Sequence, residues 1–302
     1  MEIIRGEYDF HIHTKHSDGE FTVREIIDQL LNYGCKGFSI TDHDNIDGNQ
    51  EAINYIKEKN IDIDYVTGVE FSCKDENTFV KSHILGYNID FNHDVIKTLI
   101  NKMQEMRITK MNYLFEHLKE KFDIEISEEH KNFIFSKEGT IGKPILVKIL
   151  VENNYFEKIE KELNRKLDIE EIYKVYLKLD KSKIAETNLS TKDVISAINI
   201  AGGIPILAHA SIEKQDYPEI DIEEHVKNLI SYGLKGIELY NECISEEDRI
   251  QFKEFAEKYN LITSGGSDYH GESIKEIAHV MSGIDNNCVI HENDITLLKF
   301  VK

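Results

Sequence analysis

The sequence predicts an α/β fold: a mostly parallel array of β/α units, interrupted by a mostly helical insertion. Three observations support this prediction. Short apolar runs alternate with stretches of helical periodicity, and glycines separate them. Histidine and acidic residues follow the apolar runs, as they do where parallel strands end at a common edge. Between residues 91 and 188 the alternation stops, and it resumes at Thr191.

The first half of the array can be followed from the N-terminus. Asp9–His13 alternates as a short strand does, and Thr22 and Glu25 form a capping pair ahead of apolar residues at helical spacing. The elements expected next are a strand at 37–41, a helix at 47–59, a strand at 61–69 that delivers Glu70, and a strand at 80–89 that carries His83.

The insertion and the second half of the array come next. Residues 94–122 are predicted to form one long helix, and residues 123–188 are mostly helical in pattern and charged. The array then continues with a helix at 192–201, a strand at 204–208 that delivers His209, a helix at 222–232, a strand at 236–240, a helix at 246–259, and a strand at 261–265 that leads to Asp268 and His270. We therefore expect a β/α domain from residues 1–90 and 189–302 and a helical lid domain from residues 91–188.

Composition excludes several classes of protein. Hydrophobic residues make up 40% of the 302 residues, enough for a sizeable core, and no apolar run approaches the ~20 residues of a membrane span. The N-terminus has no signal-peptide pattern, and the four cysteines are far apart, as is typical of free thiols in a reducing cytoplasm. A formal net charge of −20 repels long polyanions but permits a small anion held by bound cations. We expect a cytoplasmic protein that binds neither membranes nor long nucleic acid, and the sequence leaves the oligomeric state open.

Two histidines in the first strand are the first candidate metal ligands. His11 and His13 are two residues apart, so on a strand their side chains share a face and can hold one metal ion. Asp18 follows in a turn, where its carboxylate can lie over the end of this strand. His16 lies within the same motif but points away from that face, and we place it outside the ligand set.

Six more candidates follow later strands: His43, Glu70, His83, His209, Asp268 and His270. Each of the nine has an ordinary structural alternative, as an edge-strand polar residue, a helix N-cap, a turn residue or a satisfied core histidine. Independent accidents would not place all of them at strand ends, so the set is interpreted as a metal site. Imidazole and carboxylate together suit manganese, iron or zinc. Nine ligands are too many for one ion, so two or three divalent ions are expected, with Glu70 as a bridging carboxylate and a shared hydroxide as the attacking group.

These residues resemble the motifs of the PHP family, the polymerase and histidinol phosphatase family, in order and spacing across nearly the whole chain. The matching segments are His11-Ile12-His13, Ser17-Asp18-Gly19, Thr41-Asp42-His43-Asp44, Gly68-Val69-Glu70, His83-Ile84-Leu85-Gly86-Tyr87, Ala208-His209 and Ser267-Asp268-Tyr269-His270. The resemblance implies a distorted seven-stranded (β/α) barrel that hydrolyses phosphoesters with a cluster of two or three metal ions.

The resemblance also implies which residues share a metal ion. The three implied sets are His11, His13, Glu70 and Asp268; then Glu70, His83 and His209; and then Asp18, His43 and His270. The residues expected to act in catalysis as well are Asp18, His43, His209, Asp268 and His270.

Within the family, the chain is most similar to the stand-alone nucleoside 3′,5′-bisphosphate phosphatases, some of which also trim short RNA from the 5′ end. That branch has a basic helix and a Gly-Arg-Pro-His-like motif, which imply that Arg107, Lys110 and Lys143 bind substrate. Here lysine stands where a second helix arginine is expected. Gly142-Lys143-Pro144-Ile145 likewise has lysine for arginine and isoleucine for histidine. Lysine cannot repeat the bidentate grip of arginine on phosphate.

We therefore expect a metal-dependent phosphoesterase that acts, through a metal-activated hydroxide, on a nucleoside 3′,5′-bisphosphate or a short 5′-phosphorylated oligonucleotide. The lid is expected to close over the metal ions. Two alternatives are a histidinol-phosphate phosphatase, which would use the same metal chemistry on a smaller substrate, and a non-catalytic metal-binding PHP module. Turnover of a phosphoester would exclude the second of these.

Overall fold

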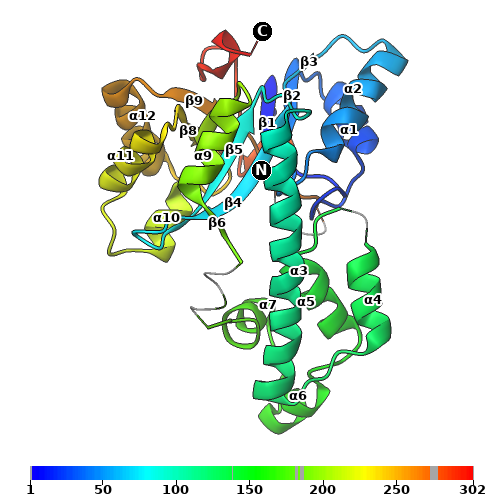
Figure 1. The fold of residues 1–302 in the computed structure, drawn as a ribbon. Helices are drawn as coiled ribbons and strands as arrows, with labels where there is room; N and C mark the ends of the chain where they lie inside the picture. Colours follow the sequence, from blue (N-terminus) through cyan, green and yellow to red (C-terminus); the bar gives the residue numbers. More distant parts are fainter. Residues whose placement is uncertain (1, 138, 181–182, 184–186, 273–277, 302) are drawn as a thin grey trace. The chain divides into compact units, whose positions relative to one another are not determined.

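The computed structural model describes residues 2–137, 139–180, 183, 187–272 and 278–301. The chain divides into two compact units. The sheet unit comprises residues 1–100 and 189–302, and the helical unit comprises residues 101–188 (Figure 1).

The strands of the sheet unit are short, and most of them are buried on both faces. They are β1 (Tyr8–Ile12), β2 (Gly37–Ile40), β3 (Asp64–Tyr65), β4 (Gly68–Lys74), β5 (Lys81–Tyr87), β6 (Leu189–Ser190), β7 (Ile204–Leu207), β8 (Gly236–Tyr240), β9 (Ile262–Gly265), β10 (Ala278–His279) and β11 (Gly283–Ile284). All residues of β1, β2 and β7 are buried, as expected for strands covered on both sides.

Among the described residues, β1, β2 and β3 form a parallel sheet, and β6, β4, β5, β7, β8 and β9 form a mixed sheet in that order. In the mixed sheet β5 runs antiparallel to both of its neighbours, β4 and β7. Two single bridges connect the sheets, one between Ile12 and Tyr269 and one between His43 and Glu70. The fold is therefore a mixed α/β fold. The closed seven-stranded barrel stays a prediction.

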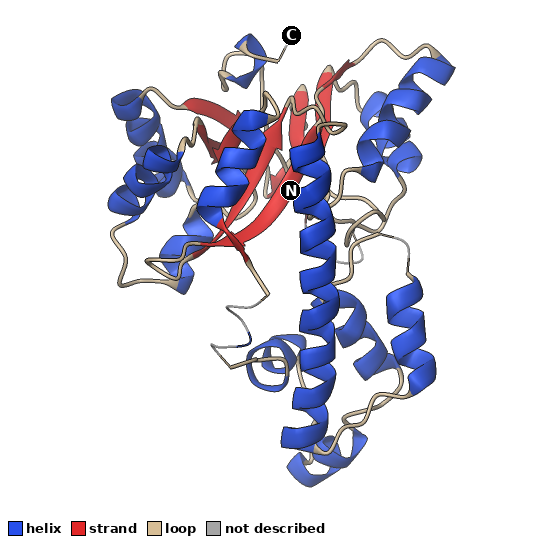
Figure 2. Cartoon of the chain, viewed as in Figure 1, coloured by secondary structure: helices blue, strands red, loops and turns tan. Residues whose placement is uncertain are grey.

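Helices flank these strands (Figure 2). In the sheet unit they are α1 (Val23–Asn32), α2 (Asp47–Lys59), α9 (Thr191–Ile200), α10 (Ser211–Asp216), α11 (Ile222–Tyr232), α12 (Glu246–Tyr259) and a short 3-10 helix (Leu297–Lys299). α2 packs on β2, α9 packs on β4, β5 and β7, and α12 packs on β8 and β9. The predicted capping box of α1 is confirmed, with Thr22 and Glu25 each bonding the other's backbone N–H.

Two hydrophobic clusters cover the strands. Ile12, Ile26 and Phe38 belong to a cluster formed by α1, α2, β1 and β2. Phe10 and Ile206 belong to a second cluster with residues of β5 and β7. Burial of β1 on both sides fixes its backbone, and this rigidity positions His11 and His13.

The helical unit is built on α3 (Asp94–Phe122), a helix of 29 residues whose first seven residues belong to the sheet unit. The other helices are α4 (Glu128–Ser136), α5 (Lys143–Glu152), α6 (Glu157–Leu163), α7 (Ile169–Glu171) and a π-helix (Ile172–Tyr176). Leu114, Leu118 and Leu150 belong to a core of this unit's own. No helix in the described part of the chain is both long and apolar enough to cross a membrane.

Two expectations about the strands are corrected. The strand expected at 61–69 is two elements, β3 and β4, so Glu70 lies inside β4 rather than after a strand. His83 lies near the beginning of β5 rather than at its C-terminal end. Because β5 is reversed relative to its neighbours, its beginning lies at the edge where their polar side chains gather.

Candidate metal centre

Glu70 is the centre of the candidate site, and it is completely buried. Backbone hydrogen bonds from Asp44 N to Glu70 O (2.9 Å) and from Glu70 N to Asp42 O (3.3 Å) hold the segment after β2 against β4. Oε2 of Glu70 lies 3.4 Å from His11 Nε2, 3.3 Å from His13 Nε2 and 3.0 Å from His43 Nδ1. Oε1 lies 3.0 Å from His83 Nδ1 and 2.9 Å from His209 Nε2. The two oxygens therefore face different histidines, so this one carboxylate could contribute to more than one metal site.

Asp268 completes the first group of candidate ligands. Its Oδ1 lies 3.4 Å from His11 Nε2 and 3.1 Å from His13 Nε2. One ligand atom from each of His11, His13, Glu70 and Asp268 lies within 4.8 Å of the others. These are the four residues that the resemblance implies for one metal ion, and all four are buried.

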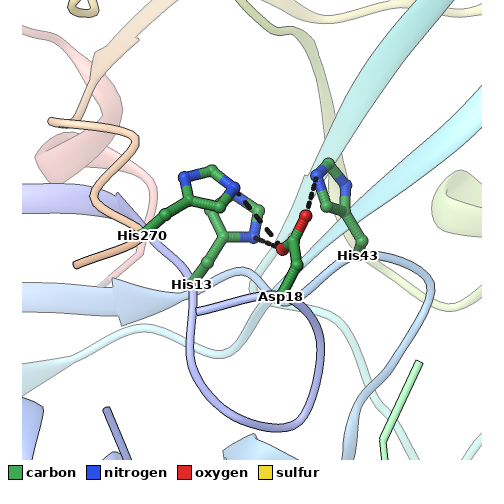
Figure 3. Close-up of side chains that lie close together, drawn as sticks. All are labelled: His13, Asp18, His43 and His270. Carbon is green, nitrogen blue, oxygen red and sulfur yellow. Dashed lines mark ion pairs between the residues drawn. The ribbon is translucent and has the colours of Figure 1, made fainter. Parts of the chain in front are cut away.

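Asp18 is the centre of a second group (Figure 3). Its Oδ1 lies 3.4 Å from His270 Nε2 and 3.8 Å from His13 Nδ1, and its Oδ2 lies 3.8 Å from His43 Nε2. His13, Asp18, His43 and His270 can offer ligand atoms within 4.8 Å of one another. His13, whose two ring nitrogens face different carboxylates, therefore adds a histidine to the implied set of Asp18, His43 and His270.

The third group consists of His43, Glu70 and His83. The implied set had His209 in place of His43. His209 lies against the same carboxylate, because its Nε2 is 2.9 Å from Glu70 Oε1. The structure thus brings all nine predicted residues into one cluster, while their division among metal ions stays a prediction.

His16 lies outside this cluster. Its Nε2 pairs with Glu51 Oε2 at 3.0 Å, and it belongs to none of the three groups. The four cysteines, Cys35, Cys73, Cys243 and Cys288, are free thiols and also lie outside the groups.

The buried carboxylates give the site a strongly negative field. Burial opposes the charged form of His13, yet contacts with Asp268 and Glu70 raise the pKa of His13 to about 10. Burial also opposes charge on His209, whose contact with Glu70 raises the pKa of that ring to about 9. Burial raises the pKa of Glu70, but the surrounding histidines, first His43, lower it well below the usual value. This field favours cations in the site.

The donor atoms of the cluster fit divalent metal ions. In the described part of the chain, the buried atoms of the cluster that have no hydrogen bond include Nε2 of His11, Nδ1 and Nε2 of His13, Oδ1 of Asp18, Oε2 of Glu70 and Nδ1 of His209. Buried polar atoms normally have a partner, because leaving one without costs about 1–3 kcal/mol. A mixture of imidazole nitrogens and carboxylate oxygens is the set that zinc, iron and manganese prefer.

Asp42 positions the segment that carries Asp18. Its Oδ1 accepts hydrogen bonds from Thr14 N (2.7 Å) and Ser17 Oγ (2.6 Å), and its Oδ2 accepts one from Thr14 Oγ1 (2.7 Å). Both oxygens of Asp42 are used by these bonds, and Asp42 belongs to none of the candidate metal groups, so we interpret it as a structural anchor for the turn.

Asp9 positions the segment that carries Asp268 and His270 in the same way. Its Oδ1 accepts a hydrogen bond from Ser267 N (2.8 Å), and its Oδ2 accepts one from Ser267 Oγ (2.6 Å) and one from Met281 N (2.8 Å). Asp268 itself has a positive φ of 55°, a backbone conformation that needs such support in a residue other than glycine.

Glu238 is a residue that the sequence reasoning missed. It lies in the middle of β8, is completely buried, and its Oε1 is 2.9 Å from His11 Nδ1. The sequence did contain a signal for Glu238. A glutamate between Ile237 and Leu239, in a short strand that is covered on both faces, is buried, and a buried carboxylate needs partners.

The three basic residues predicted to bind substrate lie together in the helical unit. Arg107 and Lys110 from α3 and Lys143 at the start of α5 line one pocket, and Arg107 Nη1 donates to Ile141 O at 3.1 Å. Gly142, the N-cap of α5, lines the same pocket. Cationic side chains beside a helix N-terminus form a site that suits phosphate.

Comparison with known proteins identifies the family. The PHP domain matches residues 9–182. The phosphoribosyl 1,2-cyclic phosphate 1,2-diphosphodiesterase of Eggerthella lenta is 25% identical over 267 residues, which cover 87% of this chain and 94% of that protein. The 3′,5′-nucleoside bisphosphate phosphatase of Chromobacterium violaceum is 24% identical over 274 residues, 90% of each chain.

A solved structure agrees with these relatives. A protein of Bifidobacterium adolescentis assigned as a metal-dependent phosphoesterase has a TM-score of 0.75 and 25% identity, over 94% of this chain and 93% of that one. Because the PHP domain match covers more than half of the sequence, this chain belongs to the PHP domain family.

Proposed function

We propose that this metal-dependent phosphoesterase hydrolyses a small phosphorylated substrate, a nucleoside 3′,5′-bisphosphate or a short 5′-phosphorylated oligonucleotide. The observation that carries the proposal is the cluster around Glu70, whose two oxygens face five histidine nitrogens at 2.9–3.4 Å. A phosphoester is a suitable substrate for such a site, because its anionic oxygens can share the cations that the site attracts.

Two or three divalent ions of manganese, iron or zinc would occupy this cluster. One would lie between His11, His13, Glu70 and Asp268, and a second would lie on the other oxygen of Glu70 with His83 and His209. A third would lie between Asp18, His43 and His270. When bound, the metal ions would lower the pKa of a water molecule and neutralise charge on the phosphate oxygens.

The chain's own residues would orient the reacting groups. Glu70 would keep the ligand histidines at fixed spacing, because its buried oxygens contact rings from several strands. Asp18 and His43 are partly exposed, with side chains 28% and 16% exposed, and together with His270 they would hold a cation beside the substrate phosphate and the attacking water. His209 and Asp268, which are both buried, complete the proposed catalytic set.

The single bridges at Ile12 and His43 also support the proposal that the strands close into a barrel. If further backbone pairs form beside them, β1, β2, β4, β5, β7, β8 and β9 would close into the distorted seven-stranded barrel. Closure would hold the strand ends rigid around the metal ions.

The activities of two relatives define the substrate test. One relative is named for a cyclic phosphodiester of phosphoribose and the other for a nucleoside 3′,5′-bisphosphate. We expect manganese-loaded protein to turn over the bisphosphate faster than p-nitrophenyl phosphate and histidinol phosphate. A panel of these three compounds, the cyclic phosphate and a short 5′-phosphorylated oligoribonucleotide checks this by kcat/KM. Highest kcat/KM on histidinol phosphate or on the cyclic phosphate would contradict the proposed substrate class but not the phosphoesterase activity.

The pocket of Arg107, Lys110 and Lys143 is proposed to bind the substrate phosphate that is not hydrolysed. Arg107→Ala should then lower kcat/KM on the bisphosphate tenfold to a hundredfold, because a charge-assisted contact contributes about 1.5–3 kcal/mol. The loss on p-nitrophenyl phosphate, which lacks the second phosphate, should be much smaller. Steady-state kinetics on both substrates measures the difference.

Lys148→Ala is a matched control for this test. Lys148 lies on α5, outside the pocket, and pairs with Glu152 at 3.9 Å. The substitution therefore removes a cation from the same unit without changing the pocket. Equal losses on both substrates in Arg107→Ala would mean that Arg107 serves the reacting phosphate or the fold. Unchanged kinetics would exclude Arg107 and direct the same test to Lys110 and Lys143.

A further inference from the structure

Glu238 contacts two of the candidate ligands at once. Its Oε1 lies 2.9 Å from His11 Nδ1, and its Oε2 accepts hydrogen bonds from the backbone N–H of His209 (2.9 Å) and from Asn241 Nδ2 (3.1 Å). Glu238 and Asn241 have no exposed surface. The carboxylate thus connects β8 with His11 in β1 and with His209 after β7, and among the described residues Glu238 belongs to none of the groups that could hold a metal ion.

The partners of Glu238 determine where the proton on His11 resides. The backbone N–H of His209 and the amide nitrogen of Asn241 are donors only, so Glu238 is an acceptor for them. Both of these donors bond Oε2. An ionised carboxylate has no hydrogen to donate, so the contact between Oε1 and Nδ1 of His11 requires the ring to carry the hydrogen on Nδ1. In a neutral ring the lone pair then lies on Nε2, the nitrogen that faces Glu70 and Asp268 at 3.4 Å.

His270 has the same arrangement, in which a fixed acceptor lies beside Nδ1 and Nε2 faces the cluster. Its Nδ1 lies 2.7 Å from the backbone carbonyl oxygen of Asp268, which can only accept, and its Nε2 faces Asp18 at 3.4 Å. In both rings a fixed acceptor behind Nδ1 leaves Nε2 for the interior of the cluster. For His270 the acceptor is main chain, whereas for His11 it is a side chain that can be replaced.

We propose that Glu238 is a positioning residue for the metal centre. It selects the Nδ1–H tautomer of His11 and, through the N–H of His209, also holds that residue's backbone at an unusual φ of 25°. Outer carboxylates of this kind orient a ligand histidine and increase its basicity toward the metal ion. The inference rests on the proposed role of His11 as a metal ligand.

Glu238→Gln tests the proposal while keeping the size of the side chain. If the amide oxygen faces His11, the amide NH₂ meets the donors of His209 and Asn241; if it is reversed, the NH₂ meets Nδ1 of His11 and the wrong tautomer results. We expect the zinc affinity of the metal-free protein, titrated against a chelator of known affinity, to fall about tenfold to a hundredfold.

Asp75→Asn is the control for simple destabilisation. Asp75 is buried and accepts from Asn77 N (2.9 Å), Thr78 N (2.7 Å) and Tyr232 Oη (2.8 Å), but it contacts no candidate ligand. Both variants should unfold more easily than the wild type, and only Glu238→Gln should bind zinc more weakly. Equal zinc affinity of Glu238→Gln and the wild type would overturn the proposal.

A measurement on the wild type tests the proposed tautomer of His11 even if Glu238→Gln does not fold. In nitrogen-labelled, zinc-loaded protein, the ring of His11 should show a proton on Nδ1 and a metal-bound Nε2. A proton on Nε2 would overturn the positioning role alone, because zinc would still be bound. A wild-type protein that binds no zinc would overturn the metal centre as well, so the two failures are distinguishable.

Discussion

Glu213 is a buried carboxylate outside the proposed ligand set. It lies on α10 and is 2% exposed, and burial raises its pKa from 4.5 to about 7, although the nearby His209 and the Ser82 hydroxyl lower it in part. Between those two pH values the folded protein keeps a proton that the unfolded chain releases. The folded state is therefore favoured at the acidic end of this window and loses that advantage as the pH rises to about 7.

Glu213→Gln should remove this dependence. The neutral amide needs no proton, so at pH 8 the variant should have a free energy of unfolding higher than that of the wild type by about 3 kcal/mol. Near pH 4.5 the two proteins should be equally stable. Urea unfolding of metal-free protein from pH 5 to pH 8 measures the difference, with the exposed Glu247→Gln on α12 as the control. If the difference in the free energy of unfolding between the two proteins stayed constant from pH 5 to pH 8, it would contradict the raised pKa of Glu213.

At the residue scale, the nine candidate ligands could be predicted because each is a chemically distinctive side chain near a strand. The residues that position them could not be found in that way. Asp9 lies in the predicted first strand and Asp42 in one of the segments that resemble the family, but their hydrogen bonds to Ser267 and Thr14 join parts of the chain that only the fold brings together. The same is true of Glu238 and His11, which are 227 positions apart.

At the element scale, local signals predicted helices better than strand direction. The bounds of α2, α11 and α12 agree with the sequence pattern because helical periodicity is local, and Asp221 and Ser245 also cap α11 and α12. The direction of β5 depends on its partner instead. Only six residues separate β4 from β5, too few for the crossover of a dozen or more residues that a parallel pair requires. The length of this connection was therefore a signal in the sequence that β4 and β5 are antiparallel.

The turn between β1 and α1 offers an element-scale prediction. Asp42 holds it by three hydrogen bonds of 2.6–2.7 Å, so Asp42→Asn should loosen the segment that carries Asp18. We expect loss of stability of about 1–3 kcal/mol, because buried bonds to a charged acceptor are replaced. The metal content should fall too, since Asp18 would no longer face His43 and His270.

Elemental analysis and urea unfolding of the same preparations measure both effects. Ser17→Ala is the graded control, because it removes one of the three bonds and leaves both contacts with Thr14. It should retain more metal than Asp42→Asn. Full metal content in Asp42→Asn would show that Asp18 reaches its position without this anchor.

At the scale of the whole molecule, the proposed ligands unite the sheet unit. They come from β1, β4 and β5 and from the segments that follow β1, β2, β7 and β9, whereas the helical unit has a hydrophobic core of its own. A metal ion that binds only the folded sheet unit stabilises it by mass action, by about 4 kcal/mol when free metal is a thousandfold above its dissociation constant. Chelation should remove this contribution.

We therefore expect EDTA to lower the Tm of manganese-loaded protein by about 10 °C, since 1 kcal/mol corresponds to about 2–4 °C in a unit of this size. Differential scanning calorimetry with and without chelator measures the shift. The formal net charge of −20 would also attract cations without any specific site, so a matched variant is needed. His11→Ala combined with His13→Ala removes two ligands from the proposed centre and leaves every surface carboxylate in place. If the centre causes the stabilisation, this variant should show little shift; an equal shift in both proteins would mean that manganese acts through the surface charge instead.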